Sequence, residues 1–185
     1  MIFISLFVHC NCQLIKDEST GILYKRPPFS DIIDLMKHTL IFETTIPCNV
    51  KTLFDFHADT KNLPHITPPD THVEVLKLKT PLKEGNEAVL RIKKGLLSFV
   101  WELTFETVAY PHLIVDVATK SPFKVFRHEH QFIEVNGRHA ILRDEVTFTL
   151  PFEPFSHLLL WFVKRDMKKM FAYRHKRTKE IITSR

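Results

Sequence analysis

From about residue 38 onward, apolar and polar residues alternate with a period of two in a series of short runs. The first run is ended by Pro47 and places on one face Leu40, Phe42, Thr44 and Ile46. Because successive side chains of a strand point to opposite faces, such runs predict strands that bury one face. Six further strands are predicted at about 71–79, 87–93, 97–110, 113–119, 123–134 and 139–150.

Helical signals stand on both sides of this strand series. Asn49 is a suitable N-cap for a short helix over 50–57, and a second short helix is predicted at 60–66, before two prolines. At the other end, apolar spacing predicts a long helix over about 154–183. Its inward stripe is Leu160, Val163, Met167, Met170, Phe171 and Arg174.

This order of elements predicts an α+β fold. A meander of antiparallel strands does not bury its inner face by itself, so the terminal helix must cover it. We therefore predict a curved, antiparallel, seven-stranded sheet wrapped around the long C-terminal helix, with two short helices after the first strand. A cavity should lie between the sheet and the helix.

Polar residues interrupt the apolar faces of the last two predicted strands. One of these faces carries Phe126, His128, His130 and Phe132, and the other carries Leu142, Asp144, Val146 and Phe148. A two-residue Asn-Gly loop would point the two sets to opposite faces of the sheet. A three-residue loop with Gly137 in the left-handed bulge position keeps them together. Asp144 should then lie opposite or diagonal to His128 and His130.

Three roles fit this pair of histidines and its carboxylate. Buried polar side chains can satisfy one another, or they can orient a ligand. They can also carry proton transfer or, as two histidines and a carboxylate, bind a metal ion. The candidate catalytic residues are therefore His128, His130 and Asp144, but the expected role is not catalytic, and we predict no metal ion and no cofactor.

The amino-acid composition excludes several classes of protein for this chain. The 185 residues are 44% hydrophobic and 25% charged, which predicts one ordinary globular domain. The four glycines form no phosphate-binding cluster, so a dinucleotide-binding fold or a P-loop is excluded. Three cysteines, Cys10, Cys12 and Cys48, are too few for a disulfide framework and favour a reducing compartment, the cytoplasm.

Residues 1–35 differ from the remainder. The apolar run over 1–8 has no basic start and no small-residue cleavage site, so a signal peptide is not expected, and it is too short to span a membrane. We expect this N-terminal extension to be either an artefact of start assignment, with translation beginning at Met36, or an arm of the domain.

Positive charge gathers at the end of the chain. Residues 151–185 contain nine basic against three acidic side chains, a balance of +6, whereas the whole chain carries +5. A basic, amphipathic helix beside a cavity can contact an anionic membrane transiently, although a charged face is more often merely solvated. No nucleic-acid partner is expected, because the aromatic residues alternate toward the interior.

The region 37–182 resembles the SRPBCC superfamily, which includes the START, birch-pollen-allergen-like and polyketide cyclase/dehydrase proteins, and is most similar to bacterial ligand-binding members of unassigned function. The resemblance rests on the order and spacing of Asn62-Leu63, Thr67-Pro68-Pro69, Trp101, Pro122-Phe123, Phe126-x-His128-x-His130-x-Phe132, Arg143-Asp144-Glu145-Val146, Leu150-Pro151-Phe152, Arg165-Asp166 and Phe171-x-Tyr173-Arg174. It implies the helix-grip fold, a pocket for small apolar or amphipathic molecules, and no established reaction.

A pocket of this kind also agrees with the aromatic strand face at 97–105. The predicted ligand-binding residues are Phe99, Trp101, Leu103, Phe105, Phe126, His128, His130, Phe132, Leu142, Asp144, Val146, Phe148, Val163, Met167, Met170 and Phe171. Binding of a lipid-like or polyketide-like ligand is the predicted function. A cyclase or dehydratase and a membrane-docking lipid carrier are the alternatives, and the oligomeric state is left open.

Overall fold

The computed structural model describes residues 14–16, 23–25, 36–151 and 157–184. The chain divides into two compact units, 1–37 and 38–185. In the first unit, strands β1 (Leu14–Lys16) and β2 (Leu23–Lys25) pair antiparallel. The sequence pattern did not predict this pair, because three-residue strands are too short to show alternation. The apolar run over 1–8, Cys10 and Cys12 lie outside the described residues.

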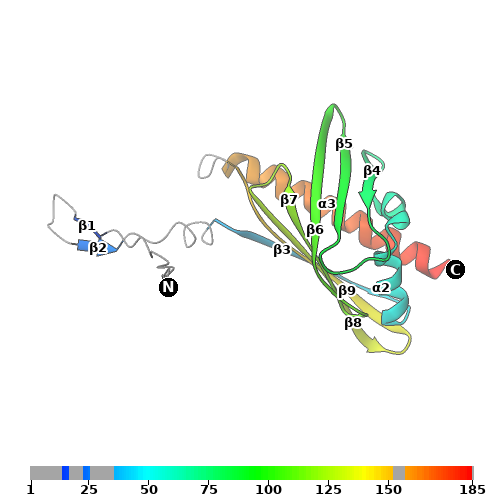
Figure 1. Ribbon diagram of the computed structural model, residues 1–185. Coiled ribbons are helices and arrows are strands. Elements are labelled where there is room, and N and C mark those ends of the chain that lie inside the picture. The colour runs from blue at the N-terminus through cyan, green and yellow to red at the C-terminus, as the bar shows by residue number, and fades with distance from the viewer. Residues whose placement is uncertain (1–13, 17–22, 26–35, 152–156, 185) are drawn as a thin grey trace, which may run out of the picture. The chain divides into compact units, whose positions relative to one another are not determined.

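The second unit contains the predicted sheet. Its strands are β3 (His38–Ile46), β4 (Thr71–Leu78), β5 (Glu87–Lys94), β6 (Leu97–Ala109), β7 (Leu113–Lys120), β8 (Val125–Asn136) and β9 (His139–Thr149). They pair antiparallel in the order β3-β9-β8-β7-β6-β5-β4. The helices are α2 (Val50–Ala58), the 3-10 helix η1 (Thr60–Ile66) and α3 (His157–Thr183). The predicted α+β helix-grip architecture is confirmed (Figure 1).

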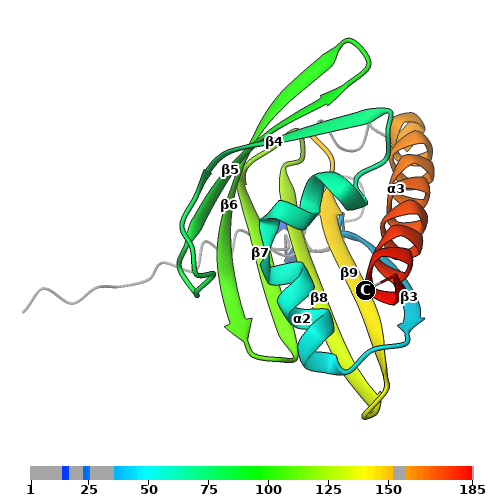
Figure 2. The same cartoon turned by 90° about the vertical axis from the view of Figure 1, so that its right-hand side faces the viewer.

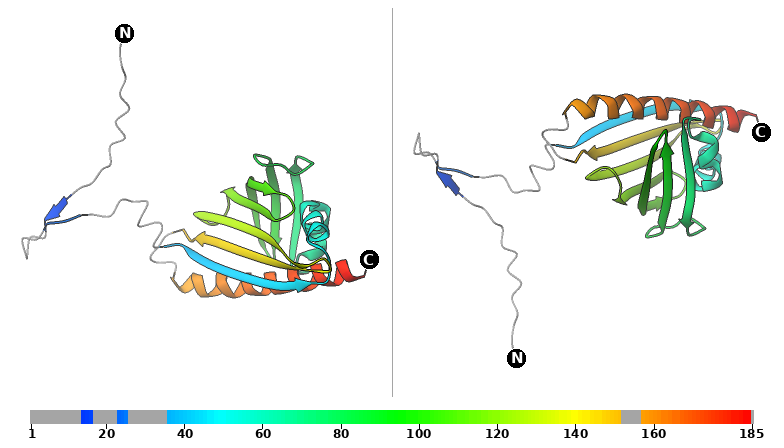
Figure 3. Two further views of the ribbon diagram at one scale, coloured as in Figure 1. Left: turned by 90° about the horizontal axis from the view of Figure 1, so that it is seen from below. Right: turned by 90° about the horizontal axis from the view of Figure 1, so that it is seen from above.

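Helix α3 covers only part of the concave face. Figures 2 and 3 show α3 running along the β3 side of the sheet. The helices α2 and η1 lie nearer the C-terminal end of α3. Phe171 stacks on Phe42 of β3 at 4.4 Å between ring centroids, and Met167 packs with Phe148 of β9 in the same apolar cluster. The strands of the opposite half of the sheet, β4 to β7, therefore lie away from this helix.

A second apolar cluster fixes α2 on the sheet. The Asn49 side chain caps this helix by accepting a hydrogen bond of 2.8 Å from the backbone N–H of Thr52, as predicted. Leu53 and Phe54 face inward and pack against Phe132 and other buried side chains. Among the described residues, no helix is long and apolar enough to cross a bilayer.

The β8–β9 hairpin decides which polar residues meet. His130 pairs with Asp144 and His128 pairs with Val146, so Asp144 is opposite one histidine and diagonal to the other, as predicted. The predicted position of the bulge was wrong. The extra residue is Val135, where the register shifts, and of the described glycines only Gly85 and Gly95 have positive φ. One extra residue in either place keeps both apolar sets on the same face.

Candidate functional site

A cavity of about 800 Å³ lies between the uncovered half of the sheet, α3 and the α2–η1 segment. Eleven of the residues predicted to bind ligand line this cavity: Phe99, Trp101, Leu103, Phe105, Phe126, His128, His130, Val163, Met167, Met170 and Phe171. Its aromatic wall is packed edge to face, with Trp101 and Phe126 at 4.7 Å and Trp101 and Phe123 at 5.7 Å between ring centroids.

The other five predicted residues share the concave face but do not line the cavity. They are Phe132, Leu142, Asp144, Val146 and Phe148, and all are at most 1% exposed. They lie where α2 and α3 pack against the sheet, so the apolar residues among them belong to the hydrophobic core. Alternation predicts which face a residue occupies, but not which part of that face a helix covers.

Asp144 organises a polar cluster beside the cavity. His128 Nε2 and His130 Nδ1 lie 3.0 and 2.6 Å from Asp144 Oδ1, and His175 Nε2 lies 2.6 Å from Oδ2. The carboxylate is fully buried. Sequence reasoning missed His175, which extends the inward stripe of α3 by four residues beyond Phe171 and thus carried a readable signal.

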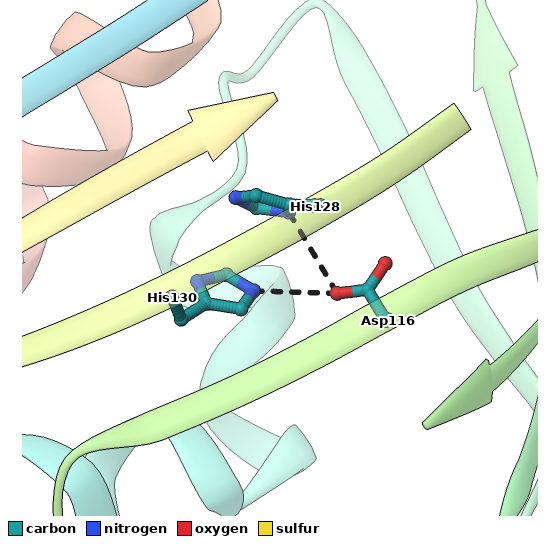
Figure 4. Close-up of side chains that lie close together, drawn as sticks. All are labelled: Asp116, His128 and His130. Carbon is teal, nitrogen blue, oxygen red and sulfur yellow. Dashed lines mark ion pairs between the residues drawn. The ribbon is translucent and has the colours of Figure 1, made fainter. Parts of the chain in front are cut away.

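Asp116 of β7 is the second buried carboxylate, and it was also missed. Its Oδ2 lies 3.4 Å from His130 Nε2 and 3.7 Å from His128 Nδ1, and Figure 4 shows the three side chains facing one another across β7 and β8. Asp116 is paired directly with His128 in the sheet. The available signal was a single acid inside the apolar run 113–117.

Two further groups bring unpartnered polar atoms to the cavity wall. His57 Nδ1 lies 2.9 Å from the carbonyl oxygen of Leu53, while its Nε2 is buried and has no hydrogen-bond partner. Arg174 Nε is likewise buried without a partner. Both residues line the cavity. Together with Asp116, His128, His130, Asp144 and His175 they make up what is called here the polar cluster.

The carboxylates of the polar cluster are ionised. Burial raises the pKa of Asp144, but the charge of His130 and hydrogen bonds from three histidines outweigh it and hold the pKa well below its usual range. For Asp116, burial is likewise outweighed by His130 and His128, and the pKa is lowered. Burial alone would lower the pKa of His130, yet the two carboxylates raise it to about 9. His130 is therefore an imidazolium at neutral pH.

The other histidines on the wall are driven toward the neutral form. Burial, followed by the charge of His130, lowers the pKa of His57 to about 3. The same two causes lower the pKa of His128. Burial lowers the pKa of the Arg174 guanidinium, which nevertheless remains the cation facing the two carboxylates. Two cations, His130 and Arg174, thus balance Asp116 and Asp144.

Comparison with known proteins fits this arrangement. The family model of polyketide cyclase/dehydrase and lipid transport proteins matches residues 46–176, well over half of the chain. The chain belongs to this family. The matched region includes every residue that lines the cavity and every member of the polar cluster.

Solved structures give the same fold at low identity. The Zhui aromatase/cyclase from Streptomyces sp. R1128 is 11% identical, with a TM-score of 0.64 and coverage of 78% of this chain and 92% of that one. Norcoclaurine synthase from Thalictrum flavum, in complex with dopamine and hydroxybenzaldehyde, is 11% identical, with a TM-score of 0.61 and coverage of 88% and 95%. Protein Ms6760 from Mycobacterium smegmatis is 16% identical, with a TM-score of 0.58 and coverage of 79% and 91%. The comparison with curated proteins gave no significant match.

The far end of the cavity is apolar and exposed. Here the β5–β6 turn and the first turns of α3 lie at the same end of the domain (Figure 2). Lys94 of β5 forms an ion pair with Asp166 of α3, which joins the two segments. The side chains that are more than half exposed there are Leu96, Leu97, Leu159, Trp161 and Phe162, called here the apolar rim.

Proposed function

We propose that this protein binds one small amphipathic molecule, lipid-like or polyketide-like, between its sheet and α3. The observation that carries this proposal is the pairing of an aromatic cavity with buried charged groups at one part of its wall. A volume of about 800 Å³ lies within the range of small-molecule sites. Apolar walls supply affinity, and a few fixed polar groups supply orientation.

The two ends of the cavity indicate the shape of the ligand. Phe162 at the apolar rim and Arg174 in the polar cluster are both on the cavity side of α3. Twelve residues of helix separate them, which corresponds to about 18 Å. A ligand with an extended apolar body and one polar end matches this length. Its polar end would satisfy the unpartnered atoms His57 Nε2 and Arg174 Nε.

The apolar rim supports ligand exchange at an anionic membrane. Three rim residues, Leu97, Leu159 and Phe162, also line the cavity, so the mouth is continuous with the binding space. Basic side chains adjoin it in the sequence on both segments: Lys93, Lys94, Lys164, Arg165 and Lys168. Each cation near such a surface contributes about 1 kcal/mol, and the apolar side chains can insert at the interface.

Displacement of a dansyl-labelled fatty acid tests the ligand site. The wild-type protein should bind the probe at one equivalent and release it to excess oleate. Leu90→Trp, which fills the cavity beside Trp101, should weaken binding at least tenfold. Val100→Trp adds the same side chain at a position that does not line the cavity and should bind like wild type. Equal affinities in the two variants would place the probe elsewhere.

Vesicle co-sedimentation tests the membrane contact. We expect binding to vesicles that contain phosphatidylserine and little binding to phosphatidylcholine alone. Leu97→Glu on the apolar rim should reduce binding at least fivefold, whereas Ile41→Glu, an exposed apolar residue on β3, should not. A loss of equal size in both variants would show that the rim is not the contact.

The free thiol of Cys48 is consistent with the reducing cytoplasm as the compartment we propose.

Proton-transfer catalysis is the second candidate function. The observation that favours it is the close approach of two imidazoles, whose ring centroids lie 3.8 Å apart. The pKa of His130 is raised to about 9, while that of His128 is lowered. Such a pair supplies an acid and a base side by side, as a cyclisation or dehydration needs. Turnover of a polyketide-like substrate that depends on His128, His130 and Asp144 would establish it, and tight binding without turnover would favour the carrier.

A further inference from the structure

We propose that Asp116, His128 and His130 form a binding site for one divalent transition-metal ion of the Zn²⁺ type, open to the cavity. The three side chains each offer one ligand atom, and these atoms lie within 4.8 Å of one another. The proposal concerns the metal ion alone, so it does not depend on which organic ligand the cavity takes.

The spacing of the three ligand atoms suits a tetrahedral ion. Metal–ligand bonds of about 2.0 to 2.1 Å at tetrahedral angles put neighbouring ligand atoms about 3.3 Å apart. Asp116 Oδ2 lies 3.4 Å from His130 Nε2 and 3.7 Å from His128 Nδ1. The two histidine nitrogens lie within 4.8 Å of each other and would move closer together when the ion binds. The ligands stand on the paired strands β7 and β8, which hold them rigidly (Figure 4).

The second ring nitrogens of both histidines face Asp144 Oδ1. His128 Nε2 is hydrogen-bonded to it at 3.0 Å, and His130 Nδ1 forms an ion pair with it at 2.6 Å without hydrogen-bond geometry. A histidine that binds a metal commonly donates its other N–H to a carboxylate, which fixes tautomer and ring orientation. His175, 2.6 Å from Oδ2, in turn holds Asp144. Asp144 is thus a supporting group, and the third ligand is Asp116.

These three ligands differ from the set that the sequence suggested. The alternating strand pattern pointed to Asp144 as the carboxylate beside His128 and His130, and no metal ion was expected. Asp144 does not line the cavity, whereas Asp116, His128 and His130 all do. Three protein ligands and a fourth position open to a cavity are the pattern of a catalytic rather than a structural zinc site.

Metal titration of untagged protein, first stripped with EDTA, tests the site. Wild type should bind one equivalent of Zn²⁺ by calorimetry, and one equivalent of Co²⁺ should give the intense visible absorption of a four-coordinate ion. Asp116→Asn and His130→Gln should each weaken Zn²⁺ binding at least tenfold. The matched controls, Asp55→Asn and His72→Gln, change exposed residues of the same types and should leave affinity unchanged.

The outcomes separate the proposal from its alternatives. If a site variant does not fold, as judged by circular dichroism, the stoichiometry and Co²⁺ spectrum of wild type still decide. No stoichiometric binding by wild type would overturn the proposal and leave the cluster as mutually paired side chains. Binding that survives in both folded site variants would overturn it as well, because the ion would lie elsewhere.

Discussion

Replacing Asp144 by asparagine removes the charge on which three histidines converge. The change is nearly isosteric, so it tests electrostatics rather than packing. Asp144 is 0% exposed, and His130 Nδ1 lies 2.6 Å from its Oδ1. Removing one partner of a buried ion pair costs about 3 to 5 kcal/mol, because the other charge stays buried.

The shifted pKa of His130 gives a second estimate of the stability that Asp144→Asn should lose. Asp144 and Asp116 raise this pKa from 6.5 to about 9, and each unit corresponds to about 1.4 kcal/mol. After the cost of burial, protonated His130 is therefore stabilised in the folded protein by a net of about 3 kcal/mol at neutral pH. Most of this should disappear in Asp144→Asn, since Asp144 is the larger of the two contributors.

Urea unfolding of EDTA-treated protein at pH 7 measures the effect. Asp144→Asn should lower the free energy of unfolding by about 3 to 5 kcal/mol. The matched control is Glu145→Gln, a neighbouring change whose side chain pairs with Arg143 at 3.5 Å and is partly exposed. It should cost less than about 1 kcal/mol. A loss below about 1 kcal/mol in Asp144→Asn would refute the buried ion-pair reasoning.

Three further predictions concern pH, the cavity wall and the N-terminal region. The free energy of unfolding of metal-free protein should be greatest near pH 6.5. The stabilisation by His130 is complete below pH 6.5 and is lost as pH rises through about 9, whereas the stabilisation by neutral His57 is lost as pH falls from 6.5 toward about 3. A free energy of unfolding that rises steadily up to pH 9 would contradict this. Trp101→Ala should lower the free energy of unfolding by about 3 kcal/mol or less, because one side of the ring already faces the cavity, and it should alter the affinity for the dansyl-labelled fatty acid. If neither the stability nor the affinity changed, Trp101 would not be part of the site. Deleting residues 1–35 should shift the Tm of the domain by only a few degrees, and a drop beyond about 10 °C would show that they belong to its core.

Much of the fold was predictable because its buried face imposes a strict period. Once Phe126 to Phe132 and Leu142 to Phe148 had to share a face, the pairing of His130 with Asp144 followed. The position of the bulge did not, because an extra residue at Val135 or at Gly137 preserves the face equally well.

The candidate site was less predictable, since it depends on contacts between distant segments. Asp116 lies in an apolar strand run, and local pattern gives no sign that it meets His128 on the next strand. His175 reaches Asp144 only because α3 crosses that part of the sheet. The division between core and cavity, as for Phe132 and Phe105, is likewise set by where the helices end.

Energy transfer from Trp101 to a dansyl-labelled fatty acid tests the central claim most directly. The chain has two tryptophans, so Trp161→Phe leaves Trp101, on the cavity wall, as the sole donor. The account predicts saturable quenching of Trp101 emission at one equivalent, sensitised dansyl emission, and reversal of both by excess oleate. Probe binding without energy transfer, or no saturable binding at all, would contradict a ligand site between the sheet and α3.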